Sequence, residues 1–440
     1  MFGCFFKKVF AALFIVFAAI LFASCSSEKD SQKLNDEDVD LRDDLDNIVN
    51  DDDQSAVNED GEVVEETDDS FEEPDVSQEV DDEESPDESD YEDAEIDCGD
   101  KKFFGHFMAE TQDEIDALEG ITEIEGLMWI YGDKITSLDP LSSLKCVGRD
   151  IKISGNPNIE SLEALSNLVR VGMEDRKEVS VFNASIELNN LKNLKDVKIL
   201  SSLKKMPGSF VMENMESLEN LAGAENLKEV GLTFRLYNVW GLKDIKALSS
   251  LEKVGEHFYL MGAGNIKNLE GLENLKNVGG TFQVYMAQNF NDTSAMKNIE
   301  QIGGMLSLVD LPSLKVVEGF EKLNEVGRFQ ISQNSSLENI SGFTSLEKCF
   351  DKFLISYNSS LKHISGFVSL EVVSGDFVIG SNDKLLDISP LFESFKTVGG
   401  VFHVYDNPEL PHCQVDHLLE NIICKEVGQI FGNNEEKTCE

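Results

Sequence analysis

The hydrophobic residues of this chain alternate between two spacings. Between Cys349 and Val373, Phe353 and Ile355 stand two positions apart, and Asn358 follows them. Hydrophobic residues then occupy every third position, at Leu361, Ile364, Phe367, Leu370 and Val373. A spacing of two is typical of a β-strand, whereas a strict spacing of three fits neither an α-helix nor a strand. The pattern therefore predicts a short strand followed by a flat arc of chain.

This unit recurs along most of the sequence. The last hydrophobic residues of the successive copies are Ile124, Val147, Val171, Met206, Val230, Val254, Val278, Ile302, Val326, Cys349, Val373 and Val398. They stand 23 to 25 residues apart, except that Val171 and Met206 are 35 apart. Such a period is typical of a solenoid, in which neighbouring coils share one hydrophobic core. We expect a mainly β solenoid of about 12 coils over residues 98–440, with a short helix at 112–118 covering the first coil.

Asparagine recurs just after the strand in several copies of the unit. Each of these residues follows the last inward strand residue by three positions, and they are Asn156, Asn334, Asn358, Asn382 and Asn407. Stacked in a solenoid, their side chains can satisfy backbone groups at one corner of every coil. We therefore expect a structural asparagine ladder.

The first 25 residues have the features of an export signal. Lys7 and Lys8 precede a hydrophobic run, Val9 to Phe22, that is too short for a typical membrane span. The run ends in Ala23-Ser24-Cys25, which resembles the lipobox of bacterial lipoproteins. That resemblance implies a signal peptide at 1–24, cleavage between Ser24 and Cys25, and a lipid on Cys25 that holds the protein on a membrane. The alternative is an ordinary secretory signal with an incidental cysteine.

Residues 25–97 have a different composition. Between residues 28 and 97 there are 34 Asp and Glu residues, against only Lys29, Lys33 and Arg42. Such a segment has too few hydrophobic residues to fold, and its like charges extend it. We expect a disordered tether that separates the solenoid from a lipid surface; a loose divalent-cation binder is the alternative. The same charge argues against a nucleic-acid partner.

Two stretches carry a resemblance to a known family. Val278-Gly279-Gly280-Thr281-Phe282 and Val398-Gly399-Gly400-Val401-Phe402, with the leucine-rich arcs around them, resemble the receptor L-domain superfamily. That resemblance covers roughly Ile121 to Cys439. It implies a right-handed, leucine-rich β-helical fold that binds ligands and occurs on bacterial surface proteins. The ending resembles closing segments of bacterial members and implies a cap at 413–440, with a helix at 414–424 and a strand at 427–431.

Six cysteines remain after the signal, and an even number in an exported chain favours disulfides. We expect Cys413 to pair with Cys439 in the cap and Cys98 to pair with Cys146 across the first coils. Cys349 and Cys424 are expected to stay free and buried. A metal site from His412, Cys413, His417 and Cys424 is the alternative, although these residues lack a paired C-x-x-C.

Outward residues of the strands are the candidate ligand-binding residues. If Leu236, Leu260, Val284 and Val404 point into the core, the residues beside them point to solvent. The candidates on that outer side are Tyr237, Tyr259, Gln283, Tyr285, Gln330, His403 and Tyr405. Aromatic and amide groups can stack on sugars or anchor a protein partner. The competing explanation is that tyrosine is common on exposed strands in any case.

No nucleophile elbow, phosphate loop or paired metal motif is present in the sequence. We therefore expect a non-catalytic, monomeric lipoprotein without a cofactor, anchored through Cys25 at the bacterial outer membrane or cell surface. Its expected role is to bind an extracellular glycan or protein. One alternative is a purely structural envelope spacer, and the other is a β-helical polysaccharide lyase, which would need carboxylates converging on neighbouring coils.

Overall fold

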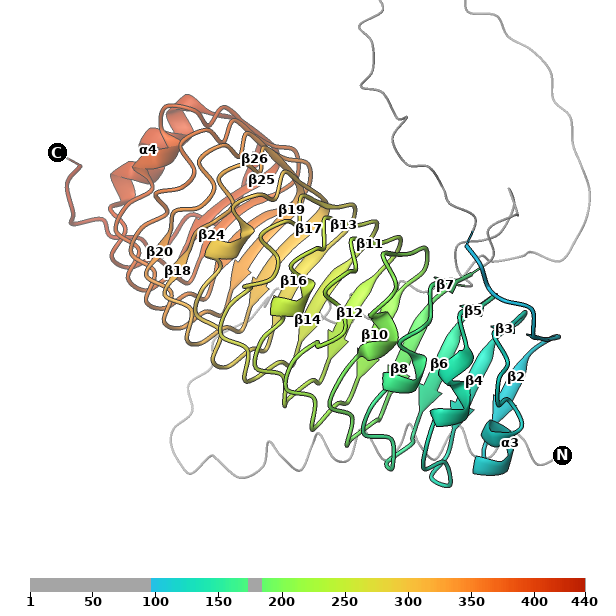
Figure 1. Ribbon diagram of the computed structural model, residues 1–440. Helices are drawn as coiled ribbons and strands as arrows, with labels where there is room; N and C mark the ends of the chain where they lie inside the picture. Colours follow the sequence, from blue (N-terminus) through green and yellow to red (C-terminus); the bar gives the residue numbers. More distant parts are fainter. Residues whose placement is uncertain (1–95, 173–183, 440) are drawn as a thin grey trace, which may run out of the picture. The chain divides into compact units, whose positions relative to one another are not determined.

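The structure is a computed structural model that describes residues 96–172 and 184–439. These residues belong to one compact unit, Asp87–Glu440. The signal peptide at 1–24, the cleavage site at Ser24 and Cys25, and all of the tether except its last two residues lie outside the described residues. The fold of the described unit is mainly β, with long parallel sheets, and is consistent with a β-solenoid (Figure 1).

One row of strands forms the largest surface of the unit. Each strand pairs in parallel with its equivalent in the neighbouring repeats; for example, Phe210 pairs with Phe234, and Phe234 with Phe258. The strands of this row are β2 (Phe107–Ala109), β4 (Met128–Tyr131), β6 (Ile151–Ser154), β8 (Ile186–Asn189), β10 (Phe210–Glu213), β12 (Phe234–Tyr237), β14 (Phe258–Met261), β16 (Phe282–Tyr285), β17 (Gln301–Val309), β19 (Glu325–Ser332), β22 (Phe353–Ser356), β24 (Phe377–Gly380), β25 (Thr397–Tyr405) and β26 (Ile423–Val427). Residues that pair between neighbouring strands are therefore the equivalent residues of neighbouring sequence repeats.

Short strands form a second row just before the first. The long strands β17, β19 and β25 run through both rows and join the second-row strands from β9 onward to the first row, whereas β1, β3, β5 and β7 form a separate four-stranded sheet. The strands of the second row are β1 (Lys102–Phe103), β3 (Glu123–Ile124), β5 (Cys146–Val147), β7 (Arg170–Val171), β9 (Lys205–Met206), β11 (Glu229–Val230), β13 (Lys253–Val254), β15 (Asn277–Val278), β21 (Lys348–Cys349) and β23 (Val372–Val373). A separate pair consists of β18 (Val316–Val317) and β20 (Asn339–Ile340).

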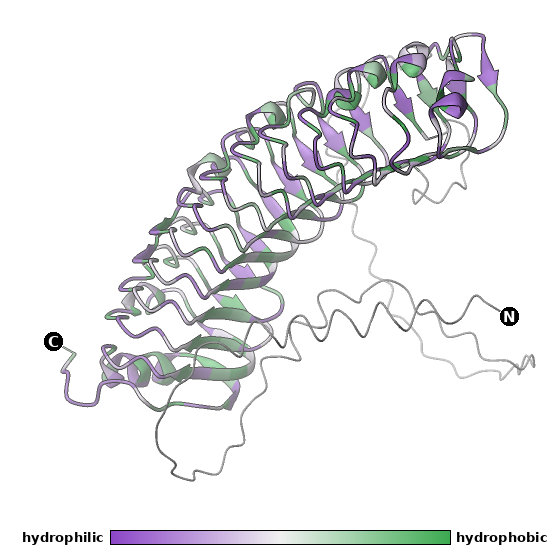
Figure 2. Ribbon diagram, turned by 90° about the horizontal axis from the view of Figure 1, so that it is seen from below, coloured by the Kyte–Doolittle hydropathy of each residue, from purple (hydrophilic) through white to green (hydrophobic). Residues whose placement is uncertain are grey.

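The return arcs contain turns and single turns of 3₁₀-helix. The short helices are η1 (Asp139–Ser143), η2 (Glu163–Leu165), η4 (Lys198–Leu200), η5 (Lys246–Leu248), η6 (Ser294–Met296) and η7 (Ser389–Leu391). Hydrophobic residues at every third position of these arcs face inward, as Leu361, Ile364 and Phe367 do, each fully buried. Hydrophobic and hydrophilic positions alternate around the coils (Figure 2).

Stacked phenylalanines fill the core behind the first row. Phe234, Phe258 and Phe282 occupy one inward position on neighbouring strands, with ring centroids 5.4 and 5.1 Å apart. Phe353 and Phe377 continue the same arrangement at 5.2 Å. Each such pair contributes roughly 0.5–1.5 kcal/mol beyond the area it buries. The repeat therefore stabilises one register, because a slip of one residue would expose these rings.

The predicted asparagine ladder exists but has different members. Asn334, Asn358, Asn382 and Asn407 are fully buried, and each side chain donates to the next residue's Oδ1 at 3.2 Å. Asn407 donates in turn to Asn433, a member that the sequence analysis did not name. Asn156 is not part of this ladder. The six repeats between Asn156 and Asn334 have hydrophobic residues at the equivalent position, so Asn156 has no neighbouring asparagine. Its buried side chain donates instead to the Gly132 carbonyl at 2.7 Å.

The residue directly after each strand of the first row from β4 to β25 is in the left-handed region. In most proteins glycine or asparagine occupies such positions, because a Cβ is strained there. Here nine non-glycine residues have a φ between 52° and 60°; they are Asn190, Asn214, Asn238, Met286, Asp310, Gln333, Tyr357, Ser381 and Asp406. The corner is thus fixed by the coil geometry, whatever residue stands at it.

The two ends of the described unit each carry a helix and a disulfide. At the N-terminal end, α3 (Gln112–Asp116) matches the predicted helix, and Cys98 bonds to Cys146. At the C-terminal end, Cys413 bonds to Cys439, so one of the two cysteines of the alternative metal site is in a disulfide. Cys349 is free and buried, and Cys424 is free but only half-buried, since β26 lies at an open sheet edge.

The elements of the C-terminal end are displaced from their predicted bounds. The helix α4 spans His412–Asn421 rather than 414–424, and its Val415 and Leu418 are buried. The last strand is β26, Ile423–Val427, rather than 427–431. The prediction placed this strand too late because pairing with β25 begins at Ile423 and crosses a register shift. Residues 428–431 still bond to β25, through Gly428 N–H to Phe402 and Val404 N–H to Gln429.

Candidate recognition face

Two residues of each strand in the first row point away from the core. We call the sixteen positions in register with Arg235 and Tyr237 on the eight strands from β12 to β25 the outer face; the longer strand β19 also carries Arg328, two positions before Gln330 and outside this set. They are Arg235, Tyr237, Tyr259, Met261, Gln283, Tyr285, Ser307, Val309, Gln330, Ser332, Leu354, Ser356, Val378, Gly380, His403 and Tyr405. All seven predicted ligand-binding residues lie on this face.

The outer face has an unusual composition for this chain. The full sequence contains 84 Asp and Glu residues, yet none occupies any of these sixteen described positions. Lysine is also missing from them, and Arg235 is the one permanent charge. Its guanidinium contacts Glu213 on β10 at 3.3 Å and lies 5.2 Å from the centre of the Tyr237 ring. The cores of binding interfaces are distinguished by few Asp, Glu and Lys residues and by the presence of Tyr, Met and Arg. The outer face has this composition.

Tyrosines gather on three consecutive strands of the face. Tyr237 lies on β12, Tyr259 on β14 and Tyr285 on β16, and Tyr237 is in register with Tyr285 across Met261. Two strand steps separate Tyr237 from Tyr285, or about 10 Å. Burial raises the pKa of Tyr259 and of Tyr285 above the ordinary value. These side chains form one cluster, which we call the tyrosine cluster.

Neighbouring groups hold the tyrosine cluster in place. The His257 ring stacks on Tyr259 with centroids 5.3 Å apart, and its Nδ1 accepts a hydrogen bond from the Thr281 N–H at 2.9 Å. Burial lowers the pKa of His257, which keeps the imidazole neutral and able to accept that bond. A neutral imidazole thus orients Tyr259, whereas the Arg235 guanidinium lies against the ring of Tyr237.

Gln283 lies in the same cluster but differs from the prediction in one respect. It points to the outer side, yet only 5% of its surface is exposed. Its Nε2 donates to Ser307 Oγ at 3.2 Å, whereas its Oε1 is buried without a hydrogen-bond partner. Sequence reasoning treated this amide as an exposed group, because strand alternation gives orientation but not how closely the neighbouring side chains pack.

The remaining predicted residues do not belong to the tyrosine cluster. Gln330 lies on β19, two strands beyond β16, and donates to Ser332 at 3.2 Å. His403 and Tyr405 lie on β25, five strand steps from Tyr285, or about 24 Å. Burial lowers the pKa of His403 and raises the pKa of Tyr405, so this second group is also neutral. The prediction thus combined two separate places on one face.

Several residues that the sequence did not single out extend the face. Leu354 and Val378 are hydrophobic, point outward and are each only 7% exposed. At the left-handed corner, Met286 follows Tyr285 and is 39% exposed, and Tyr357 is 44% exposed. Large side chains in a strained backbone region are uncommon and often mark functional sites. The one available signal was their position directly after a strand, where most other repeats have Gly, Asn or Asp.

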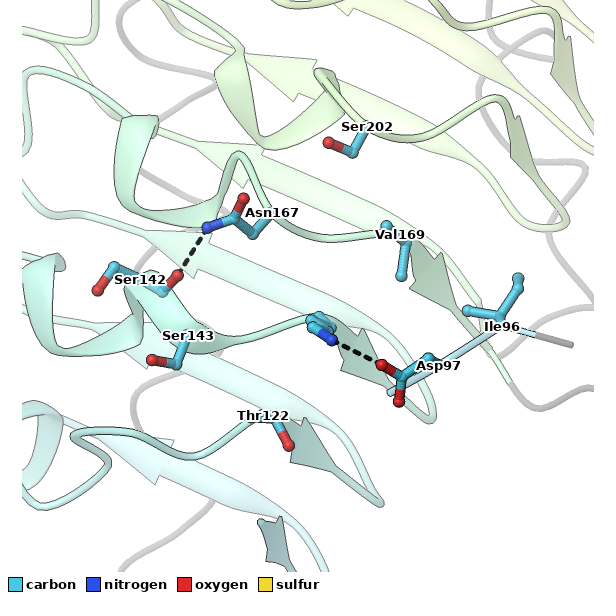
Figure 3. Close-up of a pocket in the computed structure, with 9 residues that line it drawn as sticks. Ile96, Asp97, Thr122, Ser142, Ser143, Asn167, Val169 and Ser202 are labelled. Carbon is cyan, nitrogen blue, oxygen red and sulfur yellow. Dashed lines mark hydrogen bonds and ion pairs between the residues drawn. The ribbon is translucent and has the colours of Figure 1, made fainter. Parts of the chain in front are cut away.

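A pocket of about 730 Å³ lies elsewhere, beside the ends of β3, β5 and β7 (Figure 3). Its lining residues are Ile96, Asp97, Thr122, Ser142, Ser143, Lys145, Asn167, Val169 and Ser202. Asp97 and Lys145 form an ion pair at 3.0 Å, and the Asn167 amide donates to the Ser142 carbonyl at 2.9 Å. The backbone N–H of Gly99, and then Lys145, lower the pKa of Asp97. These contacts fasten residues 96–99 to the first coils beside the Cys98–Cys146 disulfide.

Neither place offers a set of catalytic groups. The outer face has no pair of carboxylates within the described residues, and the carboxylate of the pocket is already paired with Lys145. Among the described residues, no group of three or more His, Cys, Asp or Glu side chains could hold a metal ion. No helix in the described part is long and apolar enough to cross a membrane.

Comparisons of the sequence with models of protein families and with curated proteins found no match.

Proposed function

We propose that this chain is a lipid-anchored protein of the bacterial cell envelope that binds an extracellular glycan or protein through the outer face. In this proposal Cys25 carries the lipid, residues 25–97 form the tether, and the solenoid displays its ligand site away from the membrane. The fold is a right-handed, receptor L-domain-like solenoid of about 12 coils, closed by the segment 413–440. The protein carries out no reaction and needs no cofactor.

The observation that carries this proposal is the absence of acidic residues from the sixteen described positions of the outer face. In so acidic a chain, a surface without a function would be expected to contain Asp and Glu, as the other surfaces of the chain do. Instead it holds four tyrosines, and three of them form a cluster around a buried amide. Aromatic side chains with few neighbouring charges supply binding energy without the desolvation cost of ion pairs.

A structural role in an envelope assembly is the second candidate, and one observation favours it. The outward Leu354 and Val378 make β22 and β24 hydrophobic on both sides, which is typical of strands that are covered on both faces. A permanent partner on these two strands would make the protein a spacer rather than a receptor. The polysaccharide-lyase alternative has no carboxylate on the outer face to support it.

The test compares the full-length chain, purified in detergent, with a variant in which Tyr237, Tyr285 and Tyr405 are changed to Ser. Both are assayed for binding to an array of envelope and host glycans and to whole cells. The proposal predicts binding by the parent and at least a tenfold loss in the variant, or about 1.4 kcal/mol. Tyr131→Ser is the matched control, because Tyr131 occupies the equivalent outward position on β4, four strand steps from Tyr237. Absence of binding by the folded parent would favour the structural role.

A further inference from the structure

One arginine of the chain shows how the outer face holds a cation. The guanidinium of Arg235 contacts Glu213 on β10 at 3.3 Å and lies 5.2 Å from the centre of the Tyr237 ring. Glu213 and Tyr237 are in register on neighbouring strands. A guanidinium is attracted both by a carboxylate and by the face of an aromatic ring. The positive charge therefore has two partners, a carboxylate on one strand and a tyrosine on the next.

The same two kinds of group lie together again two strands further along the face. Tyr285 ends β16, and Asp310 directly follows β17, the neighbouring strand. Val309 is in register with Tyr285, so Asp310 lies one strand spacing away and one residue further along. Burial and, to a smaller extent, the Asp310 carboxylate raise the pKa of Tyr285. The carboxylate is thus close enough to the tyrosine to act on the same ligand.

The described part of the chain supplies no cation to this second pair. Among residues 96–172 and 184–439, no lysine or arginine forms an ion pair with Asp310. Arg328 on β19 is in register with Met305, five residues before Asp310, and the two backbones are therefore roughly 17 Å apart. Glu256 is a further carboxylate beside the tyrosine cluster, because it raises the pKa of Tyr259 in addition to the larger effect of burial.

Met286 gives the second pair an apolar side. It follows Tyr285 in the left-handed region and is 39% exposed. Its backbone N–H donates to the Val309 carbonyl at 3.2 Å, which places it level with Asp310. An arginine side chain has an apolar stem and a charged head, and each finds a suitable group here. We call Tyr285, Met286 and Asp310 the cation site.

We propose that the cation site binds an arginine side chain of a basic protein partner, with the guanidinium between the Tyr285 ring and the Asp310 carboxylate. This inference rests on the proposed function and specifies its ligand. The bound arginine repeats the arrangement that Arg235 has with Tyr237 and Glu213. The net charge of −47 at pH 7 attracts a basic partner and repels an acidic one. A neutral glycan would gain nothing from the carboxylate.

The first experiment titrates the full-length chain in detergent with N-acetyl-arginine amide. The chain is labelled with 3-fluorotyrosine, and fluorine NMR follows the resonance that is missing in Tyr285→Phe. We expect a saturable shift of this resonance, because the guanidinium packs on the ring. N-acetyl-citrulline amide has the same shape without the charge and should give no saturable shift. Equal responses to the two compounds, or no response to arginine, would overturn the proposal.

Asp310→Asn tests the carboxylate without disturbing the fold. Asparagine tolerates the left-handed backbone at this position, where φ is 54°, so thermal unfolding should be unchanged. The dissociation constant of N-acetyl-arginine amide at Tyr285 should rise roughly fivefold, as expected for the loss of an exposed ion pair. Asp133→Asn is the matched control. It removes the same charge just after β4, seven strand steps from β17, and should leave the dissociation constant unchanged. Equal effects of the two variants would reduce the site to general attraction by an acidic chain and overturn the proposal.

Binding to whole cells separates this inference from the proposed function. Loss of cell binding in Asp310→Asn, with Asp133→Asn unchanged, supports both. If the variant with Tyr237, Tyr285 and Tyr405 changed to Ser loses cell binding but Asp310→Asn keeps it, the inference fails and the proposed function stands. If the folded parent binds neither cells nor glycans, both proposals fail, whatever the arginine titration shows.

Discussion

The ring of Tyr405 lies across Gly380, the outward residue in register with it on the neighbouring strand. A Cβ placed on Gly380 would stand 2.6 Å from Cζ of the tyrosine, which is closer than real atoms approach. The glycine thus provides the space in which the ring is half-buried. That burial raises the pKa of Tyr405 above its ordinary value.

This contact predicts the effect of Gly380→Ala. The added methyl group displaces the ring toward solvent, so the pKa of Tyr405 should fall back toward its ordinary value. Tyrosinate absorbance as a function of pH measures the change, and Tyr405→Phe identifies which transition belongs to this residue. Ser356→Ala, in the same slot one strand away, is the control and should leave the titration unchanged. An unshifted titration in Gly380→Ala would show that the ring does not depend on the glycine.

The asparagine ladder predicts unequal effects of two similar substitutions. Asn358 accepts from the Asn334 backbone N–H at 3.1 Å and donates to the Ile331 carbonyl at 3.0 Å. Asn358→Ala leaves the Asn334 N–H buried without a partner and removes the bond to the Ile331 carbonyl, which should lower the free energy of unfolding by roughly 2–4 kcal/mol. Asn156→Ala breaks only one such bond, to Gly132, and should cost about 1 kcal/mol. Urea denaturation of both variants measures the difference, and equal losses would contradict the ladder.

The left-handed corner predicts that stability and binding respond in opposite directions. Met286 and Tyr357 each have a φ above 50°, where glycine is free of strain. Met286→Gly and Tyr357→Gly should therefore leave the free energy of unfolding unchanged or raise it by up to about 1 kcal/mol. Both variants should nevertheless bind ligand less tightly, because they remove exposed side chains beside Tyr285 and Tyr405.

The matched control for these corner variants is Gln333→Gly. Gln333 has the same strained backbone, with a φ of 60°, but carries no aromatic or sulfur-containing side chain. It should show the same effect on thermal unfolding and no effect on binding. If all three variants destabilised the fold, the corner would depend on side-chain contacts that outweigh the strain.

The two free cysteines should differ in reactivity. Burial raises the pKa of the Cys349 thiol to about 12 from 9.0, whereas Cys424 is partly exposed on β26. The native protein should therefore react with a thiol reagent at Cys424 alone at pH 8, and at both sites after denaturation.

The same shift fixes the sign of a pH effect. The folded state keeps the Cys349 proton that the unfolded state loses, so the contribution of this group to stability falls as pH rises from 9.0 toward 12. Cys349→Ala should remove that part of the alkaline destabilisation. Rapid labelling of Cys349 in the native state would contradict its place in the core.

Much of the fold could be predicted because the sequence repeats. Phe353, Ile355 and the hydrophobic residues that follow at every third position are all buried, as their spacing predicts. The outward position of Tyr237, Tyr285 and Tyr405 follows from the same alternation. At the C-terminal end the repeat stops, and there the bounds of α4 and β26 were wrong by two to four residues. The hydrophobic pattern does not predict which residues of β25 and β26 pair, because the pairing crosses a register shift between Val398 and Val401.

The details of the candidate site depend on neighbours that are 24 residues away in sequence. Gln283 is buried because of side chains on β14 and β17, and its unpaired Oε1 follows from the position of Ser307. Leu354, an outward residue in register with Gln330, likewise becomes buried only when the strands are stacked. The overall composition also gives no indication that the outer face lacks Asp and Glu. This absence is seen only when the outward positions of successive strands are compared.

The most direct test of the account adds one carboxylate to the outer face without changing its shape. Gln330→Glu keeps the size of a half-buried residue on β19, and Gln301→Glu makes the same change at an exposed position outside the outer face, at the start of β17. The measured quantity is the dissociation constant for the ligand found by the glycan array or on whole cells. If the acid-free face is the binding surface, Gln330→Glu should weaken binding at least tenfold and Gln301→Glu less than twofold, because only the first adds a charge that binding must desolvate. Equal effects of the two substitutions would contradict the central claim that the outer face from β12 to β25 is where this protein binds.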